Sequence, residues 1–226
     1  EKKAVVEIKV IDEPVTVVVS AKGWVRALKG HEVDPAGLQF KAGDALLATF
    51  ACRSVDPLLI FGSAANGSGR VYSTAVSLLP GGRGDGQPIT TLIELEAGTQ
   101  PAHYFAGHAA QTLLLAGNAG YGLLARVGDL TARQRSGKAF LTLEAGEQWL
   151  PPALASAGML GDQVGCLSSQ GRLLVFPLSE LKVQPNGGRG LTLMDLEPRD
   201  TLASVAVFAQ ALRIEGTGRG GKARDE

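Results

Sequence analysis

Residues 111–143 read QTLLLAGNAGYGLLARVGDLTARQRSGKAFLTL, and the rest of the chain repeats the plan of this stretch. Two apolar runs, residues 113–115 and 121–125, flank the small residues 117–120. Apolar runs around a tight turn of small residues predict a β-hairpin. A basic loop and a further expected strand, residues 139–143, follow the hairpin. We therefore take a hairpin followed by a basic loop as the repeating unit.

Glycines at the expected hairpin turns reveal the repeat, because a tight turn needs a positive φ that glycine adopts without strain. Four copies align on Gly23, Gly69, Gly120 and Gly171, with spacings of 46, 51 and 51 residues. A period of ~40–50 residues in a β-rich chain is typical of propeller blades. The sequence predicts an all-β fold, a β-pinwheel or propeller-like disc of about five four-stranded blades, as a closed or an open ring.

The repeat sets the expected boundaries within one β-pinwheel domain, residues 14–226. The expected blades are residues 14–57, 58–110, 111–161 and 162–200, with a partial fifth blade at 201–226. Later strands are expected at residues 45–52, 89–95, 139–143 and 191–196. Apolar residues after Asp200 suit a helix or a strand, and we favour a strand. Residues 1–13 are either a linker or a strand that closes the ring.

Composition indicates a chain with a packed core and no membrane helix. Hydrophobic residues make up 45% of the 226 residues, and no apolar run approaches the ~20 residues that a membrane helix needs. No secretory signal pattern is found near the first residues. Cys52 and Cys166 stand alone in apolar runs, so we expect buried reduced thiols and a cytoplasmic setting.

Strings that look like catalytic or metal-binding motifs lack the neighbouring residues that such sites need. The glycine-rich residues 81–86, GGRGDG, are followed by a strand pattern rather than the helix of a phosphate-binding loop. His103 and His108 are five residues apart, a spacing that separates them on a strand or a helix. Tyr72 and Tyr121 lie in apolar runs, as packing residues do. We expect no active site, no metal and no cofactor in this chain.

Charge is balanced overall but unevenly distributed. The chain has 22 basic and 22 acidic residues, so its net charge is zero. Residues 22–31 nevertheless hold three cations and no acid, and residues 126–138 hold four cations and one acid. A neutral total can therefore include a basic edge that attracts a polyanion.

Basic residues recur beside glycines in the loops after the hairpins, in PGGRGDG, RQRSGKA and NGGRG. Glycine lets a backbone approach a phosphate closely, and Arg and Lys supply the charge. Solvated turns are the alternative interpretation of each loop taken alone. The predicted phosphate contacts are Lys29, Arg83, Arg133, Arg135, Lys138 and Arg189, with Lys22, Arg26, Arg70 and Arg172 as flanking candidates.

Several stretches resemble the C-terminal β-pinwheel domains of the A subunits of bacterial type IIA topoisomerases. The most specific is residues 13–44, EPVTVVVSAKGWVRALKGHEVDPAGLQFKAGD, which is similar to the opening of this domain in topoisomerase IV. NAGYGLL at 118–124, DLTARQRSGKA at 129–139 and LLVFPLSEL at 173–181 agree with it. The resemblance extends from about residue 13 to residue 199.

The resemblance implies a non-catalytic domain that binds double-stranded DNA and helps to select the transported duplex. Its partners would be the rest of the A subunit, together with the ATPase B subunit, in an A2B2 enzyme that relaxes and decatenates DNA during chromosome segregation. Mg²⁺ and ATP would be used by other parts of that enzyme. The family cleaves DNA with a tyrosine that follows an arginine, and no Arg-Tyr pair occurs in the 226 residues.

The resemblance also implies that this domain does not wrap DNA as gyrase does. The gyrase A subunit carries the basic heptapeptide Gln-Arg-Arg-Gly-Gly-Lys-Gly in its first blade, whereas residues 27–37 here read ALKGHEVDPAG. The segment most similar to the heptapeptide, residues 134–138, lies in the third repeat. A propeller that binds protein or sugar, and a catalytic propeller, remain as alternatives. Aromatic residues make up only 5% of the chain, which disfavours the first of these.

Overall fold

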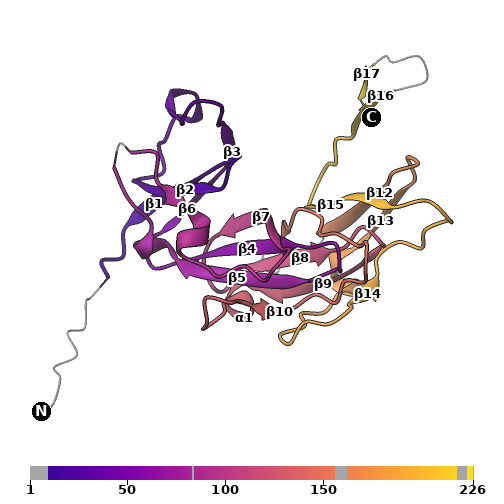
Figure 1. Ribbon diagram of the computed structural model, residues 1–226. Helices are drawn as coiled ribbons and strands as arrows, with labels where there is room; N and C mark the ends of the chain where they lie inside the picture. Colours follow the sequence, from indigo (N-terminus) through magenta and orange to yellow (C-terminus); the bar gives the residue numbers. More distant parts are fainter. Residues whose placement is uncertain (1–9, 83, 156–161, 218–222, 226) are drawn as a thin grey trace, which may run out of the picture.

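The computed structural model describes residues 10–82, 84–155, 162–217 and 223–225. These residues form four antiparallel sheets and a separate two-stranded hairpin (Figure 1). The longest helical element among them is the four-residue turn α1. The all-β pinwheel prediction is therefore confirmed, with three four-stranded sheets and one three-stranded sheet in place of about five blades.

Each sheet is built on a hairpin of two apolar strands. Three of the turns hold a positive-φ glycine at the expected position, Gly23, Gly120 and Gly171. In the second hairpin the positive φ is at Gly67, so the alignment on Gly69 was wrong by two residues. The hairpins are β1 (Pro14–Ser20) with β2 (Trp24–Lys29), β4 (Pro57–Ser63) with β5 (Arg70–Ala75), β8 (Thr112–Ala116) with β9 (Tyr121–Arg126), and β12 (Gln163–Ser168) with β13 (Leu173–Pro177).

A third strand pairs with the first strand of each hairpin. The strand expected at residues 45–52 is confirmed as β3, and the strand favoured after Asp200 is confirmed as β15. Because β15 pairs with β12, the boundary placed after residue 200 was wrong: it falls inside the fourth sheet. The third strands are β3 (Leu46–Arg53), β7 (Gln100–Ala106), β11 (Ala153–Ala155) and β15 (Leu202–Phe208).

The fourth strand of a sheet comes from the following repeat. The sheet orders are β3-β1-β2-β6, β10-β5-β4-β7, β11-β8-β9-β14 and β13-β12-β15. The strands expected at residues 139–143 and 191–196 were too long, and the strand expected at residues 89–95 was wrong because none of these residues is in a strand. Each donated segment pairs for only two residues before it turns towards its own sheet. Ile89–Thr91 is the 3-10 turn η3. The donated strands are β6 (Gln87–Pro88), β10 (Lys138–Ala139) and β14 (Leu191–Thr192).

A short helical turn begins directly after the second strand of the last three hairpins. These turns are η2 (Val76–Leu78), α1 (Val127–Leu130) and η4 (Leu178–Glu180), and they start 51 residues apart. From each turn the chain crosses to the preceding sheet and supplies its donated strand. We call residues 79–86, 131–137 and 182–190 the crossing segments. A further 3-10 turn, η1 (Pro35–Gly37), lies in the loop of the first repeat.

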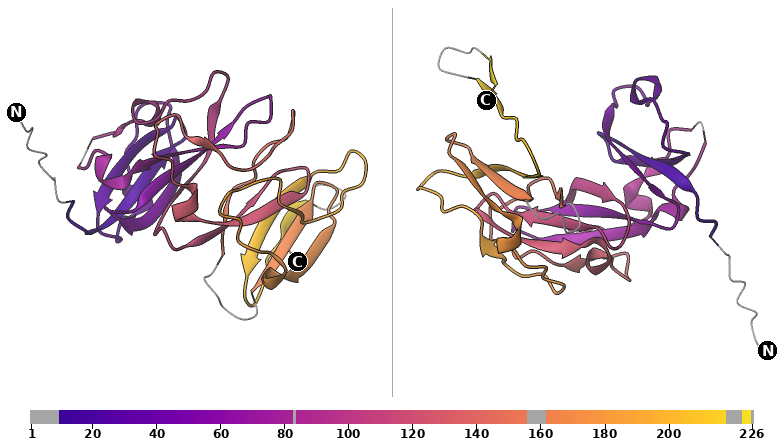
Figure 2. Two further views of the ribbon diagram at one scale, coloured as in Figure 1. Left: turned by 90° about the horizontal axis from the view of Figure 1, so that it is seen from below. Right: turned by 180° about the vertical axis from the view of Figure 1, so that it is seen from behind.

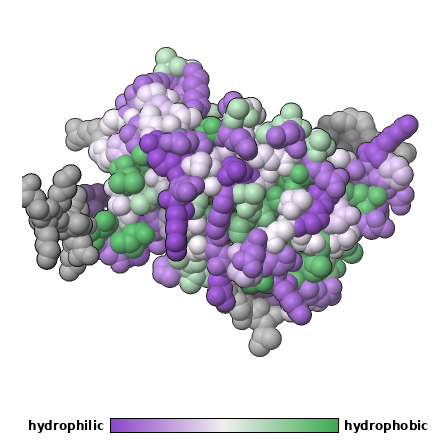
Figure 3. Space-filling model, turned by 60° about the horizontal axis from the view of Figure 1, so that its bottom comes forward, coloured by the Kyte–Doolittle hydropathy of each residue, from purple (hydrophilic) through white to green (hydrophobic). Residues whose placement is uncertain are grey.

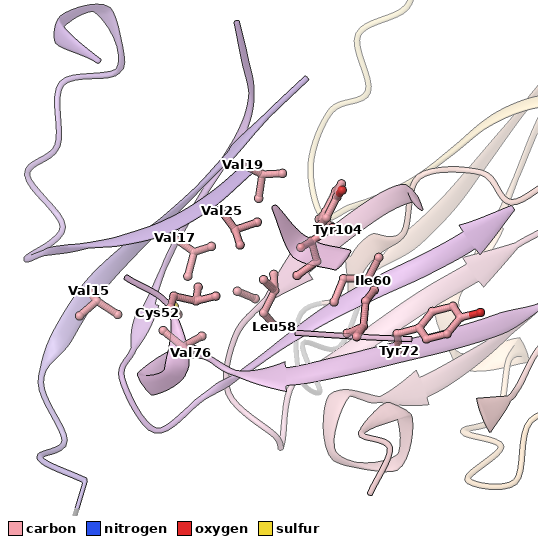
Figure 4. Packing of buried hydrophobic residues seen from close by; sticks show 14 residues of the cluster. Val15, Val17, Val19, Val25, Cys52, Leu58, Ile60, Tyr72, Val76 and Tyr104 are labelled. Carbon is pink, nitrogen blue, oxygen red and sulfur yellow. The ribbon is translucent and has the colours of Figure 1, made fainter. Parts of the chain in front are cut away.

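The core fills the spaces between neighbouring sheets as three clusters. In the first cluster, Val17 and Val19 of β1 face Leu58 and Ile60 of β4 (Figure 4). Apolar residues line both faces of β4 and β8, which explains their continuous apolar runs. The expectation of buried thiols is confirmed. Cys52 and Cys166 are buried and free, and burial raises the pKa of both to about 11.

The first and fourth sheets lie at opposite ends of an open arc (Figures 1 and 2). Within the described residues no strand of one pairs with the other. Residues 10–13 contain no strand, and residues 1–9 of the expected linker or closing strand lie outside the described part. The hairpin β16 (Glu215–Thr217) and β17 (Ala223–Asp225) follows β15. No helix in the described ranges is long and apolar enough to cross a membrane.

Candidate nucleic-acid interface

The crossing segments carry basic residues at similar positions before the donated strands. Arg133 and Arg135 precede β10, and Lys138 is its first residue. Arg189 lies two residues before β14. Arg83 belongs to the first crossing segment but lies outside the described residues. What distinguishes these side chains is the set of groups that each one contacts.

Arg189 is neutralised by an acid of the preceding repeat. Its guanidinium donates two hydrogen bonds to the carboxylate of Glu147, with 2.6 Å between Nη2 and Oε1, and a third to the carbonyl of Thr142 at 3.0 Å. It also lies 4.2 Å from the ring centroid of Tyr121. The hydrogen bond from Arg189 lowers the pKa of Glu147. Arg189 thus joins two repeats, and the 42-residue separation from Glu147 hid this pairing from the sequence.

Arg26 is buried, with only 6% of its surface exposed. Its guanidinium donates to the carbonyl of Gly84 and, at 2.9 Å, to that of Gln39. The centroid of the Phe40 ring lies 5.5 Å from the guanidinium carbon. Arg26 therefore fastens the first crossing segment and the loop of the first repeat onto the first sheet. It is not placed to reach a phosphate outside the protein.

Four of the other predicted cations lie beside acids. The nitrogen-to-oxygen distances are 3.9 Å for Lys29 and Glu13, 3.5 Å for Arg70 and Glu96, and 3.9 Å for Arg172 and Glu197. The carboxylate of Asp44 accepts the backbone N–H of Lys22 at 3.0 Å. These exposed pairs are weak, but each acid reduces the net charge that a polyanion would meet.

Three of the predicted cations lie close together in the sequence and form no ion pair with a described residue: Arg133, Arg135 and Lys138, which we call the basic cluster. Arg133 is exposed and makes no hydrogen bond to any described residue. Arg135 donates from Nε to the carbonyl of Leu92 at 3.0 Å and from Nη2 to that of Thr91 at 2.5 Å. Lys138 donates to the backbone carbonyl of Asp129. A carbonyl orients a cation without cancelling its charge.

The backbone of the basic cluster is fixed against the second sheet. The hydroxyl of Ser73 on β5 accepts the N–H of Ala132 at 2.8 Å and donates to its carbonyl at 3.1 Å. The N–H of Glu94 donates to the carbonyl of Arg135 at 2.9 Å. Gly137 has a φ of 65°, and a Cβ there would lie 2.5 Å from the carbonyl oxygen of Val71. These contacts fix the backbone of the basic cluster before any ligand binds, so less conformational entropy is lost on binding.

Sequence reasoning missed further exposed cations that have no ion pair in the described part of the chain, and Lys41, Arg126 and Lys182 are among them. The Lys41 ammonium lies 3.4 Å from the ring centroid of Trp24. None of the three belongs to a glycine-rich string, which was the signal used. On the face seen in Figure 3, hydrophilic side chains alternate with separate hydrophobic patches.

The histidines and Tyr72 have structural contacts. Nε2 of His103 lies 3.2 Å from the carbonyl oxygen of Trp149, and burial lowers the pKa of this histidine. Nδ1 of His108 accepts the N–H of Ala110. Tyr72 is fully buried and its hydroxyl accepts a backbone N–H, as expected for a packing residue. In the ranges that the structure covers, no three His, Cys, Asp or Glu side chains are grouped to hold a metal ion.

Comparison with protein families and curated proteins places this geometry in context. The family model described as the DNA gyrase C-terminal domain, beta-propeller, matches residues 162–209. The A subunit of DNA topoisomerase 4 from Neisseria gonorrhoeae is 36% identical over 234 residues, which is 99% of this chain and 29% of that protein. The Escherichia coli K12 protein of the same name is 37% identical over 184 residues, or 81% of this chain and 24% of that protein. The chain thus spans less than a third of these relatives.

Solved structures share the fold. The structure of the E. coli ParC C-terminal domain superposes with a TM-score of 0.82 at 33% identity, over 94% of this chain and 86% of that one. A C-terminal domain of DNA topoisomerase IV gives 0.75 at 20% identity, over 96% and 68%. The DNA gyrase A C-terminal domain gives 0.63 at 17% identity, over 94% and 71%. The last two comparisons bear on the fold alone.

Proposed function

Because the chain belongs to the family of C-terminal β-pinwheel domains found in the ParC protein of DNA topoisomerase IV, we propose that it binds double-stranded DNA through the basic cluster. The observation that supports this most directly is the concentration of three cations without carboxylate partners, among the described residues, within residues 133–138. Cations that neutralise phosphates release condensed counterions, and this release drives binding to duplex DNA.

The remaining predicted cations have secondary roles in this proposal. Lys22, Lys29, Arg70 and Arg172 remain secondary candidates, because a phosphate would compete there with a neighbouring acid. Arg83 keeps its place as a candidate on the first crossing segment, from the sequence alone. Arg26 and Arg189 position the crossing segments and make no phosphate contact.

The proposed contact reads little of the base sequence. The basic cluster lies on an irregular segment, and the longest helix in the described residues has four residues. Side chains read base edges mainly from a helix or ribbon inserted into the major groove, whereas contacts to phosphates position the protein. We therefore expect affinity for duplex DNA of any sequence.

Within the enzyme, the domain would position the transported duplex during ATP-dependent relaxation, decatenation and chromosome segregation. The core of the ParC protein and its ATPase partner, in an A2B2 assembly, would supply Mg²⁺, ATP and the cleaving tyrosine. Residues 27–37 take the place of the gyrase heptapeptide, and Asp34 caps the turn η1 within this loop. This segment holds a single Lys and no Arg, so we infer binding without gyrase-like wrapping.

Titration of a fluorescein-labelled linear duplex, followed by fluorescence anisotropy, tests the proposal. The expected result is salt-sensitive binding of unrelated sequences with similar affinity. Failure to bind at low salt would favour the alternative of a protein-interaction propeller. A parallel relaxation assay on circular DNA should leave few constrained supercoils, and strong constrained supercoiling would contradict the absence of wrapping.

A further inference from the structure

An apolar hollow of about 630 Å³ lies beside the basic cluster. Its walls come from the loop before β4, the end of β5, the turn η2, the turn η3 and residues 131–135. Its volume falls in the range of ligand-binding clefts. The apolar residues that line it include Val55, Pro57, Ala75, Leu78, Leu92 and Ala132.

Leu78 is the unusual residue of this hollow, because 63% of its surface is exposed. The repeat provides an internal comparison, since Leu78 is the third residue of η2. The third residues of α1 and η4 are Asp129 and Glu180. The next residue along the chain is a buried leucine in all three repeats: Leu79, Leu130 and Leu181. The fold therefore accepts an acid at the position of Leu78 and does not require an exposed leucine.

Val55 adds a second exposed apolar side chain, with 49% of its surface accessible. Together with Leu78 it forms an apolar surface on the wall of the hollow. Arg133 lines the same hollow and has no partner among the described residues. Apolar surface beside an uncompensated cation indicates a binding site for an amphipathic anion.

Several polar groups of the hollow are already bonded inside the protein. Ser73 is bound to the backbone of Ala132, Thr91 donates to the carbonyl of Pro88, and Thr131 donates to that of Val127. The buried carboxylate of Asp56 accepts the backbone N–H of Arg53 at 2.8 Å. A small polar metabolite needs free polar groups to orient it, and few remain here.

We propose that this hollow is the docking site for a protein segment that places one or two large apolar side chains next to Asp or Glu. The apolar side chains would cover Leu78 and Val55, and the acid would pair with Arg133. The charge of Arg135 would add to the attraction. Duplex DNA offers phosphates but no apolar side chain to fill the hollow, so the occupant differs in chemistry from the proposed DNA partner.

The test uses the 226-residue chain and a fluorescein-labelled peptide with a central Leu-Phe-Leu run between aspartates. Fluorescence anisotropy is measured without DNA, so the result does not depend on the proposed function. Leu78→Gln removes the apolar contact without changing the charge. Arg133→Gln copies Gln184, the residue 51 positions later in the repeat. Leu154→Gln on β11 is the control, because Leu154 is 48% exposed and does not line the hollow.

We expect Leu78→Gln and Arg133→Gln each to weaken peptide binding by about tenfold, since each removes one of the two recognised features. Leu154→Gln should bind the peptide as the unmodified chain does. A peptide with lysines in place of the aspartates should bind poorly to the unmodified chain. The proposal is overturned if the aspartate peptide does not bind, or if Leu78→Gln and Leu154→Gln bind it equally well. Circular dichroism on each variant confirms that the folds match.

Discussion

Replacing Arg133, Arg135 and Lys138 together by glutamine removes the basic cluster, whose three cations form no ion pair with a described residue. Each neutralised phosphate contributes about −0.9 to the slope of log K against log salt concentration. Three contacts predict a contribution near −2.7, so raising salt from about 50 to about 200 mM should weaken binding roughly fortyfold. The triple variant should lose this contribution.

Single substitutions refine this measurement. Arg133→Gln should reduce the slope by about 0.9 and leave the melting temperature unchanged, because an exposed charge without partners contributes little to stability. Arg172→Gln is the matched control, since this guanidinium is 47% exposed but lies 3.9 Å from Glu197. Its slope should change less than that of Arg133→Gln. A triple variant that remains folded and keeps the slope of the unmodified chain would refute the assignment of phosphate contacts to the basic cluster.

Three further predictions concern stability. Gly187→Ala should destabilise far more than Gly146→Ala: a Cβ at Gly187 would lie 2.0 Å from a carbonyl oxygen, whereas at Gly146 only the positive φ costs ~1–3 kcal/mol. Urea unfolding compares them, and equal losses would contradict the steric argument. Glu147→Gln should cost about 2 kcal/mol at pH 7 through loss of the bonds from Arg189. Because the folded pKa of Glu147 lies below 4.5, this contribution is present above pH 4.5 and is lost as pH falls through the folded pKa. Melting temperatures of both forms across that range should therefore converge in acid, and a constant difference would exclude this linkage. Trp149→Phe should cost ~1–3 kcal/mol, because the buried indole N–H donates to a backbone carbonyl of β4 at 2.9 Å; an unchanged urea midpoint would show that this bond is not stabilising.

The period of the fold was readable from the sequence because it depends on local chemistry. The turn glycines and the apolar runs around them need only neighbouring residues to act, and they predicted four hairpins, with the turn of the second misplaced by two residues. Strand donation was not readable in this way. β6 and β2 are separated by more than 50 residues, and the two residues of each donated strand carry no distinct pattern. Expected strands such as residues 89–95 failed for this reason.

The contacts of the predicted cations could not be read from the sequence. Arg133, Arg189 and Arg26 look alike beside their glycines or apolar neighbours, yet within the described residues one has no partner, one is paired with Glu147 and one is buried. The contacting groups come from distant parts of the chain, so only the folded protein distinguishes the three. Leu78 was missed for a related reason. An exposed leucine stands out only when the equivalent acids of α1 and η4 are aligned with it.

Donation of the fourth strand has a consequence for synthesis on the ribosome. The first sheet can be completed only after residue 88 has emerged, when most of the second repeat has already been translated. Each later repeat closes the sheet before it and leaves its own edge open, so maturation proceeds from the amino end in overlapping steps. A break in translation between hairpins would release a chain with an unpaired edge, which is prone to aggregate. No single repeat could be excised as an autonomous unit, and gain or loss of repeats in evolution would have to preserve this overlap.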